Sequence, residues 1–117
     1  MPGPDSIGAF EQLVLTAILA LRDDAYGVSI HAKVEELARP KKVSIGAVYV
    51  TLDRMDDKGL ISSNLSKPTA ERGGRAKRFY QLQAAGERAL EESAVTAKRV
   101  WDNIIQVWGK DWARQCH

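Results

Sequence analysis

Apolar positions along the first part of the chain recur at helical spacing. Phe10, Leu13, Val14, Ala17, Ile18 and Leu21 fall three and four positions apart, which predicts a helix over about residues 9–22. Leu15 and Leu19 lie off this stripe. A helix that is apolar on more than one side is buried on more than one side, so we expect a second subunit to cover Leu15 and Leu19.

Two further helices are expected before residue 60. The second begins at Gly27 and ends before Pro40, because the residue before a proline is pushed out of the α region. Its inner face comprises Ile30, Val34 and Leu37. The third has Ser44 as its N-cap and Gly59 as its stop. Its buried stripe comprises Ile45, Val48, Leu52 and Met55.

The rest of the chain predicts a β-hairpin and one long helix. Short strands are expected over residues 60–65 and 77–82, joined by a basic loop with two glycines, and a helix over residues 84 to about 112. Three helices followed by a hairpin is the winged helix-turn-helix order. We therefore predict a mainly α fold with a small β-hairpin, divided into a winged helix-turn-helix domain (residues 1–83) and a C-terminal dimerisation helix (residues 84–117).

Positive charge is concentrated in the hairpin loop, although the net charge of the 117 residues is only +2. Residues 67–78 hold five cations against the single anion Glu71, and Lys41 and Lys42 form a second cluster. This asymmetry indicates a local anionic partner. The alternative is a solvated loop, which is the commoner meaning of any single run of charges.

Several classes of protein are disfavoured by the composition. Cys116 is the only cysteine, so no intramolecular disulfide can form, which fits a cytoplasmic protein. The first ten residues do not resemble a signal peptide, and the apolar stretch at residues 13–21 is too short to span a bilayer. His31 and His117 lack partners at metal-ligand spacing, and no nucleophile–base pair stands out. We expect no enzymatic activity, no metal and no cofactor.

Three stretches together carry a resemblance to a known family. They are "AYGVSI" (residues 25–30), "SIGAVYVTLDRMDDKGLI" (residues 44–61) and "RGGRAKRFYQLQAAG" (residues 72–86). In this order and spacing the chain resembles the PadR family of bacterial transcriptional regulators, in its smaller subgroup with a single C-terminal helix. The resemblance implies a DNA-binding homodimer, most often a repressor, with a small effector bound at the dimer interface in some members. Gln83, Val50 and Thr51 depart from the family pattern, which usually has threonine and proline at these places.

The candidate DNA-binding residues lie around the third helix and the hairpin loop. The N-terminal part of the second helix of a helix-turn-helix reaches base edges, while cations and a glycine-containing wing tip meet phosphates. Tyr49 could donate to a phosphate, or be a half-buried packing residue. Tyr80 is expected in the core, and Asp53 and Asp57 outside the groove. The candidate residues are Lys41, Lys42, Ser44, Gly46, Ala47, Tyr49, Val50, Arg72, Gly73, Gly74, Arg75, Lys77 and Arg78.

The final helix carries a heptad-like seam, which predicts a homodimer that binds a near-palindromic operator. The candidate interface residues are Leu15, Leu19, Leu90, Ala94, Ala97, Trp101, Ile104 and Trp108. Trp101 and Trp108 are also candidate walls for a planar aromatic effector, although filling the interface is the favoured explanation. The rival function is a winged helix that binds another protein and no DNA, which the acidic Asp53, Asp56 and Asp57 keep open. The operator, the regulated genes, the effector and the sign of regulation do not follow from the sequence.

Overall fold

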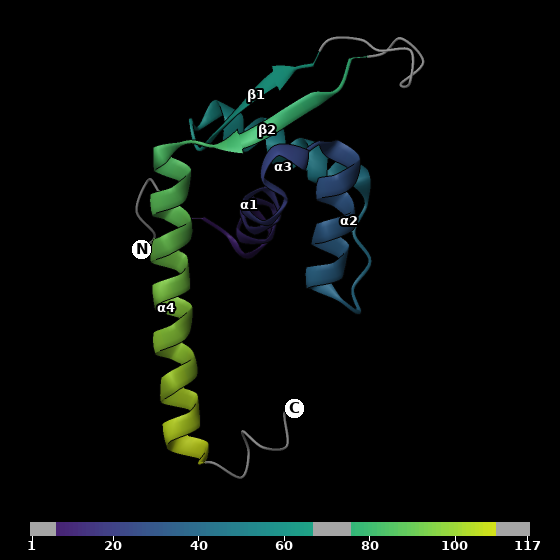
Figure 1. The fold of residues 1–117 in the computed structure, drawn as a ribbon. Helices are drawn as coiled ribbons and strands as arrows, with labels where there is room; N and C mark the ends of the chain where they lie inside the picture. Colours follow the sequence, from purple (N-terminus) through teal and green to yellow (C-terminus); the bar gives the residue numbers. More distant parts are fainter. Residues whose placement is uncertain (1–6, 67–75, 110–117) are drawn as a thin grey trace.

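The computed structural model describes residues 7–66 and 76–109, and it has the predicted order of elements (Figure 1). The helices are α1 (Ala9–Leu21), α2 (Gly27–Ala38), α3 (Ile45–Asp57) and α4 (Ala84–Trp108), with a 3₁₀ turn, η1 (Arg22–Asp24), after α1. The strands are β1 (Ile61–Leu65) and β2 (Arg78–Leu82). The prediction of a mainly α fold with one hairpin and a long last helix is confirmed.

Local signals in the sequence account for both ends of α3. The Ser44 hydroxyl accepts a hydrogen bond from the backbone N–H of Ala47 at 3.1 Å, so Ser44 is the N-cap of α3 as predicted. Gly59 follows α3 with a φ of 77°, a left-handed conformation that glycine adopts without strain. Gln83 precedes α4 without a side-chain cap, and its amide donates instead to the Ser62 hydroxyl at 2.6 Å.

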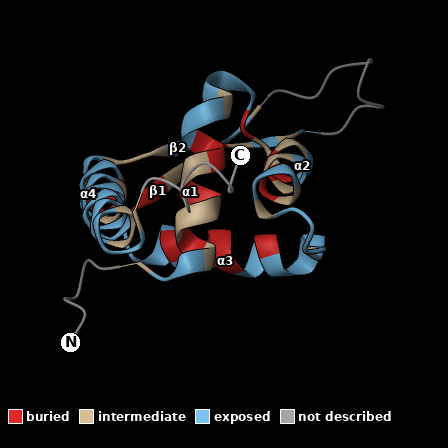
Figure 2. Cartoon of the chain, turned by 90° about the horizontal axis from the view of Figure 1, so that it is seen from below, coloured by how far each residue is buried: buried red, intermediate tan, exposed pale blue. Residues whose placement is uncertain are grey.

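Helix α1 is the central element of the fold. It contacts α2, α3, α4 and β2, and Figure 2 shows it lying between α2 and α4. Leu15 has no exposed surface, because these elements of its own chain cover it. The prediction that a second subunit covers Leu15 is therefore wrong, whereas Leu19 is 55% exposed at the end of α1. The buried hydrophobic core comprises Val14, Leu15, Ala17, Ile18, Ala25, Ile30, Val34, Val48, Leu52, Met55, Leu60, Ile61, Tyr80 and Ala89.

Two positions predicted to be buried are exposed, and both lie at helix ends. Leu37 in the last turn of α2 is 42% exposed, and Ile45 at the start of α3 is 41% exposed. A helical stripe identifies positions that share a face, but its ends extend past the neighbouring helices that cover its middle. Both assignments to the core are corrected for this reason.

The hairpin is antiparallel, with its register running from the pair Ile61–Leu82 to the pair Leu65–Arg78. Tyr80 lies in the core as predicted, with 6% of its surface exposed. Its backbone N–H donates to the carbonyl of Ala25 at 2.8 Å, so β2 is also bonded to the segment that precedes α2.

Helix α4 begins inside the core and extends well beyond it (Figure 1). Gly86 and Ala89 are buried in its first turns, and Ser93 donates to the side chain of Gln12 in α1 at 3.2 Å. A Cβ atom at Gly86 would lie 3.1 Å from the carbonyl carbon of Leu60 and nearer still to its oxygen, so this close approach requires glycine. The C-terminal half of α4 has no such neighbours, and most of its residues are exposed.

Candidate nucleic-acid interface

The first half of α3 presents an exposed face without charged side chains. We call Gly46, Ala47, Tyr49 and Val50 the α3 face; all four are exposed, Tyr49 at 42% and Val50 at 58%. Val48 between them is fully buried and anchors the helix in the core. Small residues at the start of a helix let its backbone approach a groove closely, and an exposed valine can touch a thymine methyl group.

Tyr49 is the half-exposed aromatic residue of the α3 face. The residue is 42% exposed, but the end of its side chain, the hydroxyl oxygen first, packs against the start of α2. A Cβ atom at Gly27 would lie 2.7 Å from Cε1 of Tyr49, closer than real Cβ contacts allow. Only glycine at position 27 therefore leaves this place to the tyrosine ring.

The residue before α2, Tyr26, also contacts the hairpin. The rings of Tyr26 and Phe79 meet edge to face with centroids 5.7 Å apart, and the ammonium of Lys77 lies 3.9 Å above the Tyr26 ring. The segment Tyr26–Gly27 thus contacts α3 through one residue and β2 through the other. This arrangement fixes the hairpin relative to the α3 face.

The predicted cations differ in how accessible they are. Lys41 and Lys42 are exposed in the turn before α3. Arg78 is exposed and donates to the Ser63 hydroxyl at 2.8 Å, while Lys77 is partly covered by its contact with Tyr26. Arg39, two residues before Lys41, is also exposed and was not among the predicted cations. Four predicted residues, Arg72, Gly73, Gly74 and Arg75, lie outside the described residues.

The second half of α3 is acidic and exposed. Asp53, Asp56 and Asp57 are all exposed there. Burial raises the pKa of the nearby Tyr80 hydroxyl, and Asp53 and Asp56 raise it further against the opposing effect of Arg78. Tyr80 is therefore neutral at physiological pH. The negative charge at this end of α3 would repel phosphate.

The predicted interface residues of α4 fall into two groups. Leu90 packs partly against the core of its own chain, so its assignment to a subunit interface is corrected in part. Ala94, Ala97, Trp101 and Trp108 are exposed and Ile104 is half-buried. Exposed Val100 and Val107 were missed, because a strict heptad omits them. We call Ala97, Val100, Trp101, Ile104, Val107 and Trp108 the α4 apolar stripe.

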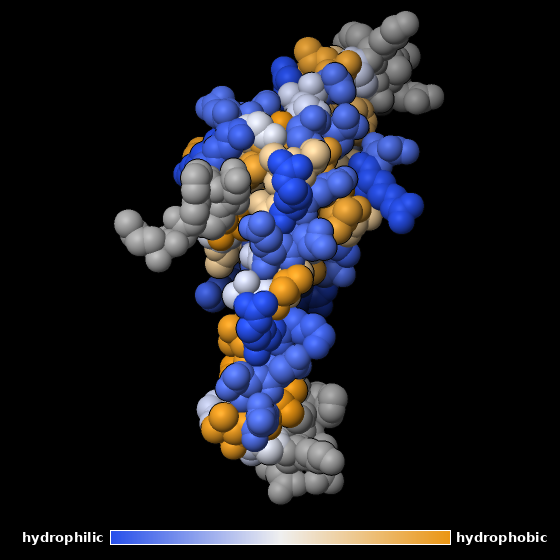
Figure 3. Space-filling model, turned by 90° about the vertical axis from the view of Figure 1, so that its left-hand side faces the viewer, coloured by the Kyte–Doolittle hydropathy of each residue, from blue (hydrophilic) through white to orange (hydrophobic). Residues whose placement is uncertain are grey.

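The α4 apolar stripe continues the face that α4 turns toward α1. Ile104 follows Ser93, whose hydroxyl donates to Gln12 of α1, by about three turns of 3.6 residues, so the two lie on the same side of the helix. Figure 3 shows the other side of α4, the side turned away from α1, where hydrophobic groups lie among hydrophilic ones on the narrow lower part of the molecule. An open apolar hollow of about 490 Å³ lies beside Ile104, Val107 and Trp108.

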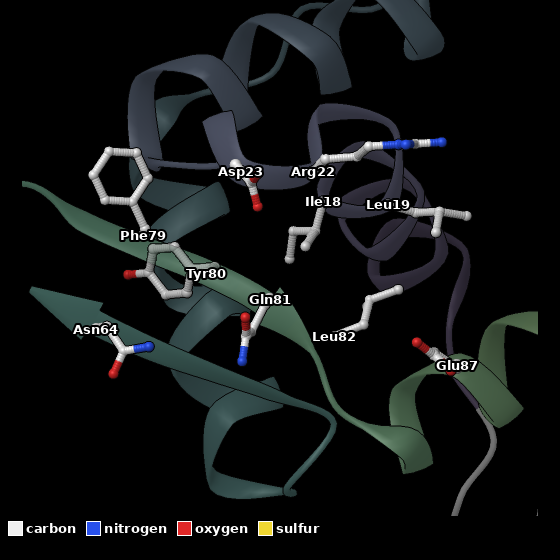
Figure 4. Close-up of a pocket in the computed structure, with 10 residues that line it drawn as sticks. All are labelled: Ile18, Leu19, Arg22, Asp23, Asn64, Phe79, Tyr80, Gln81, Leu82 and Glu87. Carbon is white, nitrogen blue, oxygen red and sulfur yellow. The ribbon is translucent and has the colours of Figure 1, made fainter. Parts of the chain in front are cut away.

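A second hollow, of about 310 Å³, lies between the end of α1, η1 and β2. Figure 4 shows Asp23 on one side of it and Glu87 of α4 on another, with Ile18 and Leu82 between them. Trp101 and Trp108 do not line this hollow. Arg22 also lines the hollow, so one guanidinium accompanies the two carboxylates.

Neither a metal site nor a membrane span is found in the parts of the chain that the structure describes. Residues 7–66 and 76–109 contain no group of three or more histidine, cysteine, aspartate or glutamate side chains that could hold a metal ion. Within the same ranges, no helix combines the length and the apolar character that crossing a membrane requires.

The arrangement of the elements defines a winged helix-turn-helix protein. A model of the family described as "Transcriptional regulator PadR-like family" matches residues 14–92. The chain belongs to this family. The expectations of a transcriptional regulator and of a protein that is not an enzyme are thereby confirmed.

Solved structures agree with the family. A PadR family transcription regulator from Clostridium difficile R20291 is 29% identical, with a TM-score of 0.71 over 87% of this chain and 100% of that one. A PadR-like transcriptional regulator from Bacillus cereus is 23% identical, with a TM-score of 0.70 over 88% and 94%. Bacillus subtilis PadR, solved in complex with operator DNA, is 19% identical, with a TM-score of 0.61 over 74% and 47%. A search of curated proteins found no significant match.

Proposed function

We propose that this chain is a DNA-binding transcriptional repressor that acts in the cytoplasm as a homodimer on a near-palindromic operator. The observation that carries the proposal is the α3 face, which is exposed, free of charged side chains and directly preceded by exposed Lys41 and Lys42. Bacillus subtilis PadR, which has the same fold, was solved in complex with operator DNA.

Each group of residues has a distinct role in this proposal. Gly46 and Ala47 allow the backbone of α3 to enter the major groove, where Val50 contacts a thymine methyl group. The hydroxyl of Tyr49 donates to a phosphate. Cations and glycines contact the DNA phosphates on both sides of the groove. They are Lys41, Lys42, Arg72, Gly73, Gly74, Arg75, Lys77 and Arg78.

A second copy of the chain covers the α4 apolar stripe in this proposal. Val100, Val107 and the two tryptophans form an apolar surface larger than scattered exposed residues would, and such surfaces mark interaction sites. Ala94, and Leu19 at the end of α1 near Glu87 in the first turn of α4, extend this interface toward the core. Residues 84–117 thus serve as the dimerisation helix and residues 1–83 as the DNA-binding domain. Dimerisation would set two α3 faces about 34–36 Å apart, one turn of DNA.

Trp101 and Trp108 are the candidate site for a planar aromatic effector that releases the operator. Aromatic walls suit planar molecules, and the hollow beside Trp108 is apolar. Quenching of tryptophan fluorescence by a panel of planar compounds, together with release of DNA, would support this role. Without quenching, the two residues only fill the interface.

The alternative is a winged helix whose same surface binds another protein and no DNA. Exposed Asp53, Asp56 and Asp57 on α3 are the observation in its favour. It predicts that duplex DNA neither binds nor competes at the α3 face.

Fluorescence anisotropy with the duplex upstream of the chain's own gene, and with a shuffled duplex, tests the DNA-binding proposal. Val50→Ala should change the preference among operator variants. Val28→Ala is the matched control, because Val28 has the same exposed fraction, 58%, on α2. An unchanged preference in Val50→Ala would remove Val50 from base readout.

Reduced transcription from that promoter on adding the protein would support repression, whereas increased transcription would contradict it.

A further inference from the structure

Two side chains of α2 hold the turn that leads into α3. The Nε2 atom of His31 lies 2.7 Å from the carbonyl oxygen of Val43, and a carboxylate oxygen of Glu35 accepts the backbone N–H of Val43 at 3.2 Å. Both backbone hydrogen-bonding groups of one turn residue are therefore bound by side chains of the preceding helix. Neither side chain is among the residues proposed to contact DNA.

The geometry of α2 makes this double contact possible. His31 and Glu35 are four residues apart and lie on the same side of the helix, with Nε2 3.7 Å from a Glu35 carboxylate oxygen. A carbonyl oxygen can only accept, so the proton of the His31 ring is on Nε2. The side chain of Val43 also packs against the core, so the residue is fixed by this contact as well as by its two backbone hydrogen bonds.

We propose that His31 and Glu35 are positioning residues that set the placement of the first turn of α3 on DNA; this rests on the proposed DNA-binding function. Val43 directly precedes Ser44, the N-cap of α3, and directly follows Lys42. Fixing Val43 therefore fixes both the start of the α3 face and a cation beside it. Neither side chain needs to touch DNA to have this effect.

Loss of this contact should affect specific and non-specific binding differently. Non-specific binding depends on cations near phosphates and tolerates a small change in the direction of α3. Base readout requires side chains placed against particular base edges, so it does not tolerate the change. The ratio of operator affinity to affinity for a shuffled duplex is therefore the informative quantity.

Two pairs of variants distinguish the effect of side-chain length from the effect of side-chain charge. His31→Gln keeps a donor at nearly the same reach, whereas His31→Asn is too short. Glu35→Gln keeps the reach and loses the charge, whereas Glu35→Asp keeps the charge and loses the reach. Glu36→Asp is the control, because Glu36 is exposed on the same helix and pairs with Lys33 at 3.1 Å.

Binding to the duplex upstream of the chain's own gene and to a shuffled duplex is measured for each variant, well below its melting temperature. We expect His31→Asn and Glu35→Asp to lower the affinity ratio about tenfold, which is the size of one lost base contact. The two glutamine variants and Glu36→Asp should retain it. Equal loss on both duplexes, or glutamine variants as defective as the short ones, would overturn the proposal.

Amide hydrogen exchange in the absence of DNA tests the contact itself. The N–H of Val43 should exchange faster in Glu35→Asp than in Glu35→Gln or Glu36→Asp, because its acceptor is withdrawn. Unchanged protection would overturn the positioning role even if DNA binds. A wild-type protein that binds no duplex, with Val43 protected, would instead contradict the proposed function.

Discussion

The ring of Tyr49 in α3 occupies the space that a side chain would need at Gly27, the first residue of α2. The two residues are far apart in the sequence and lie in two different stretches that carry the family resemblance, residues 25–30 and 44–61. Their contact explains why a tyrosine of the α3 face accompanies a glycine at the start of α2. It also means that the direction of the Tyr49 hydroxyl depends on a residue that is itself buried.

Gly27→Ala should weaken operator binding more than it lowers stability. The new methyl group would meet the far end of the Tyr49 side chain, which can swing toward solvent because it is 42% exposed. The free energy of unfolding should therefore change by less than about 1 kcal/mol, below the usual cost of overpacking. Urea unfolding and anisotropy titration measure the two effects. In a Tyr49→Ala background the same substitution should leave operator affinity unchanged, and an equal loss there would show that Tyr49 does not transmit the effect.

Gly86→Ala should be much more damaging to the fold. Its methyl group would meet the backbone carbonyl of Leu60, which also accepts the N–H of Gln83 at 2.9 Å and cannot move independently. We expect a loss of about 1–3 kcal/mol in the free energy of unfolding, the usual range for overpacking. Gly46→Ala is the control, since no atom lies within 4 Å of a Cβ at Gly46. It should stabilise α3 by about 0.5–1 kcal/mol. Equal effects of both substitutions on thermal unfolding would contradict the close approach at Leu60.

The ion pair between buried Glu11 of α1 and exposed Lys58 should make stability depend on pH. Burial alone would raise the pKa of Glu11, but the N–H of Gly8 and the ammonium of Lys58, each 3.0 Å away, hold that pKa below its ordinary value of 4.5. A carboxylate with a lowered folded-state pKa stabilises the fold above 4.5, and this contribution is lost as the pH falls through the folded-state pKa.

Chemical unfolding of the wild type and of Glu11→Gln across acidic pH measures this contribution. The wild type should lose stability more steeply below pH 4.5 than the variant, which lacks the titrating group. Glu36→Gln is the control at an exposed carboxylate, and it should follow the wild type. Parallel profiles for wild type and Glu11→Gln would rule out a lowered pKa at Glu11.

Ile104→Asp should abolish dimerisation and operator binding together. It places a charge in the middle of the α4 apolar stripe. Ile104 belongs to the C-terminal half of α4, which extends away from α3 (Figure 1). Gln106→Asp adds the same charge to the opposite side of α4 and should leave the dimer intact. Sedimentation velocity gives the oligomeric state. An Ile104→Asp protein that sediments as a dimer and binds the operator would disprove this interface.

Much of the fold could be predicted because its signals are local. The Ser44 cap, the Gly59 stop and the buried side of β2 at Tyr80 each depend on neighbouring residues, and all three are confirmed. How far the buried part of a helical stripe extends depends on the neighbouring helices, which periodicity does not show. For this reason the prediction that Ile45 and Leu37 lie in the core was wrong. Leu15 was wrong for a related reason, since periodicity does not show that four elements of the same chain surround α1.

The residues that position the α3 face could not be found by pattern alone. His31 and Glu35 bind a backbone carbonyl and a backbone N–H, which any residue at position 43 except proline would offer. The contact of Gly27 with Tyr49 joins two motifs that were visible in the sequence, but nothing in the spacing shows that they touch. The side chains on the α3 face themselves were predictable, because they follow from the position of buried Val48.

The salt dependence of binding to the duplex upstream of the chain's own gene tests the DNA-binding proposal most directly. The logarithm of the association constant should fall linearly with the logarithm of the salt concentration, by about 0.9 for each phosphate neutralised. Removing one phosphate contact with Lys42→Ala should make the slope shallower by about 1 on operator and shuffled duplexes alike. A slope near zero, or no preference for the upstream duplex over the shuffled one at any salt concentration, would contradict the proposal that this chain recognises an operator.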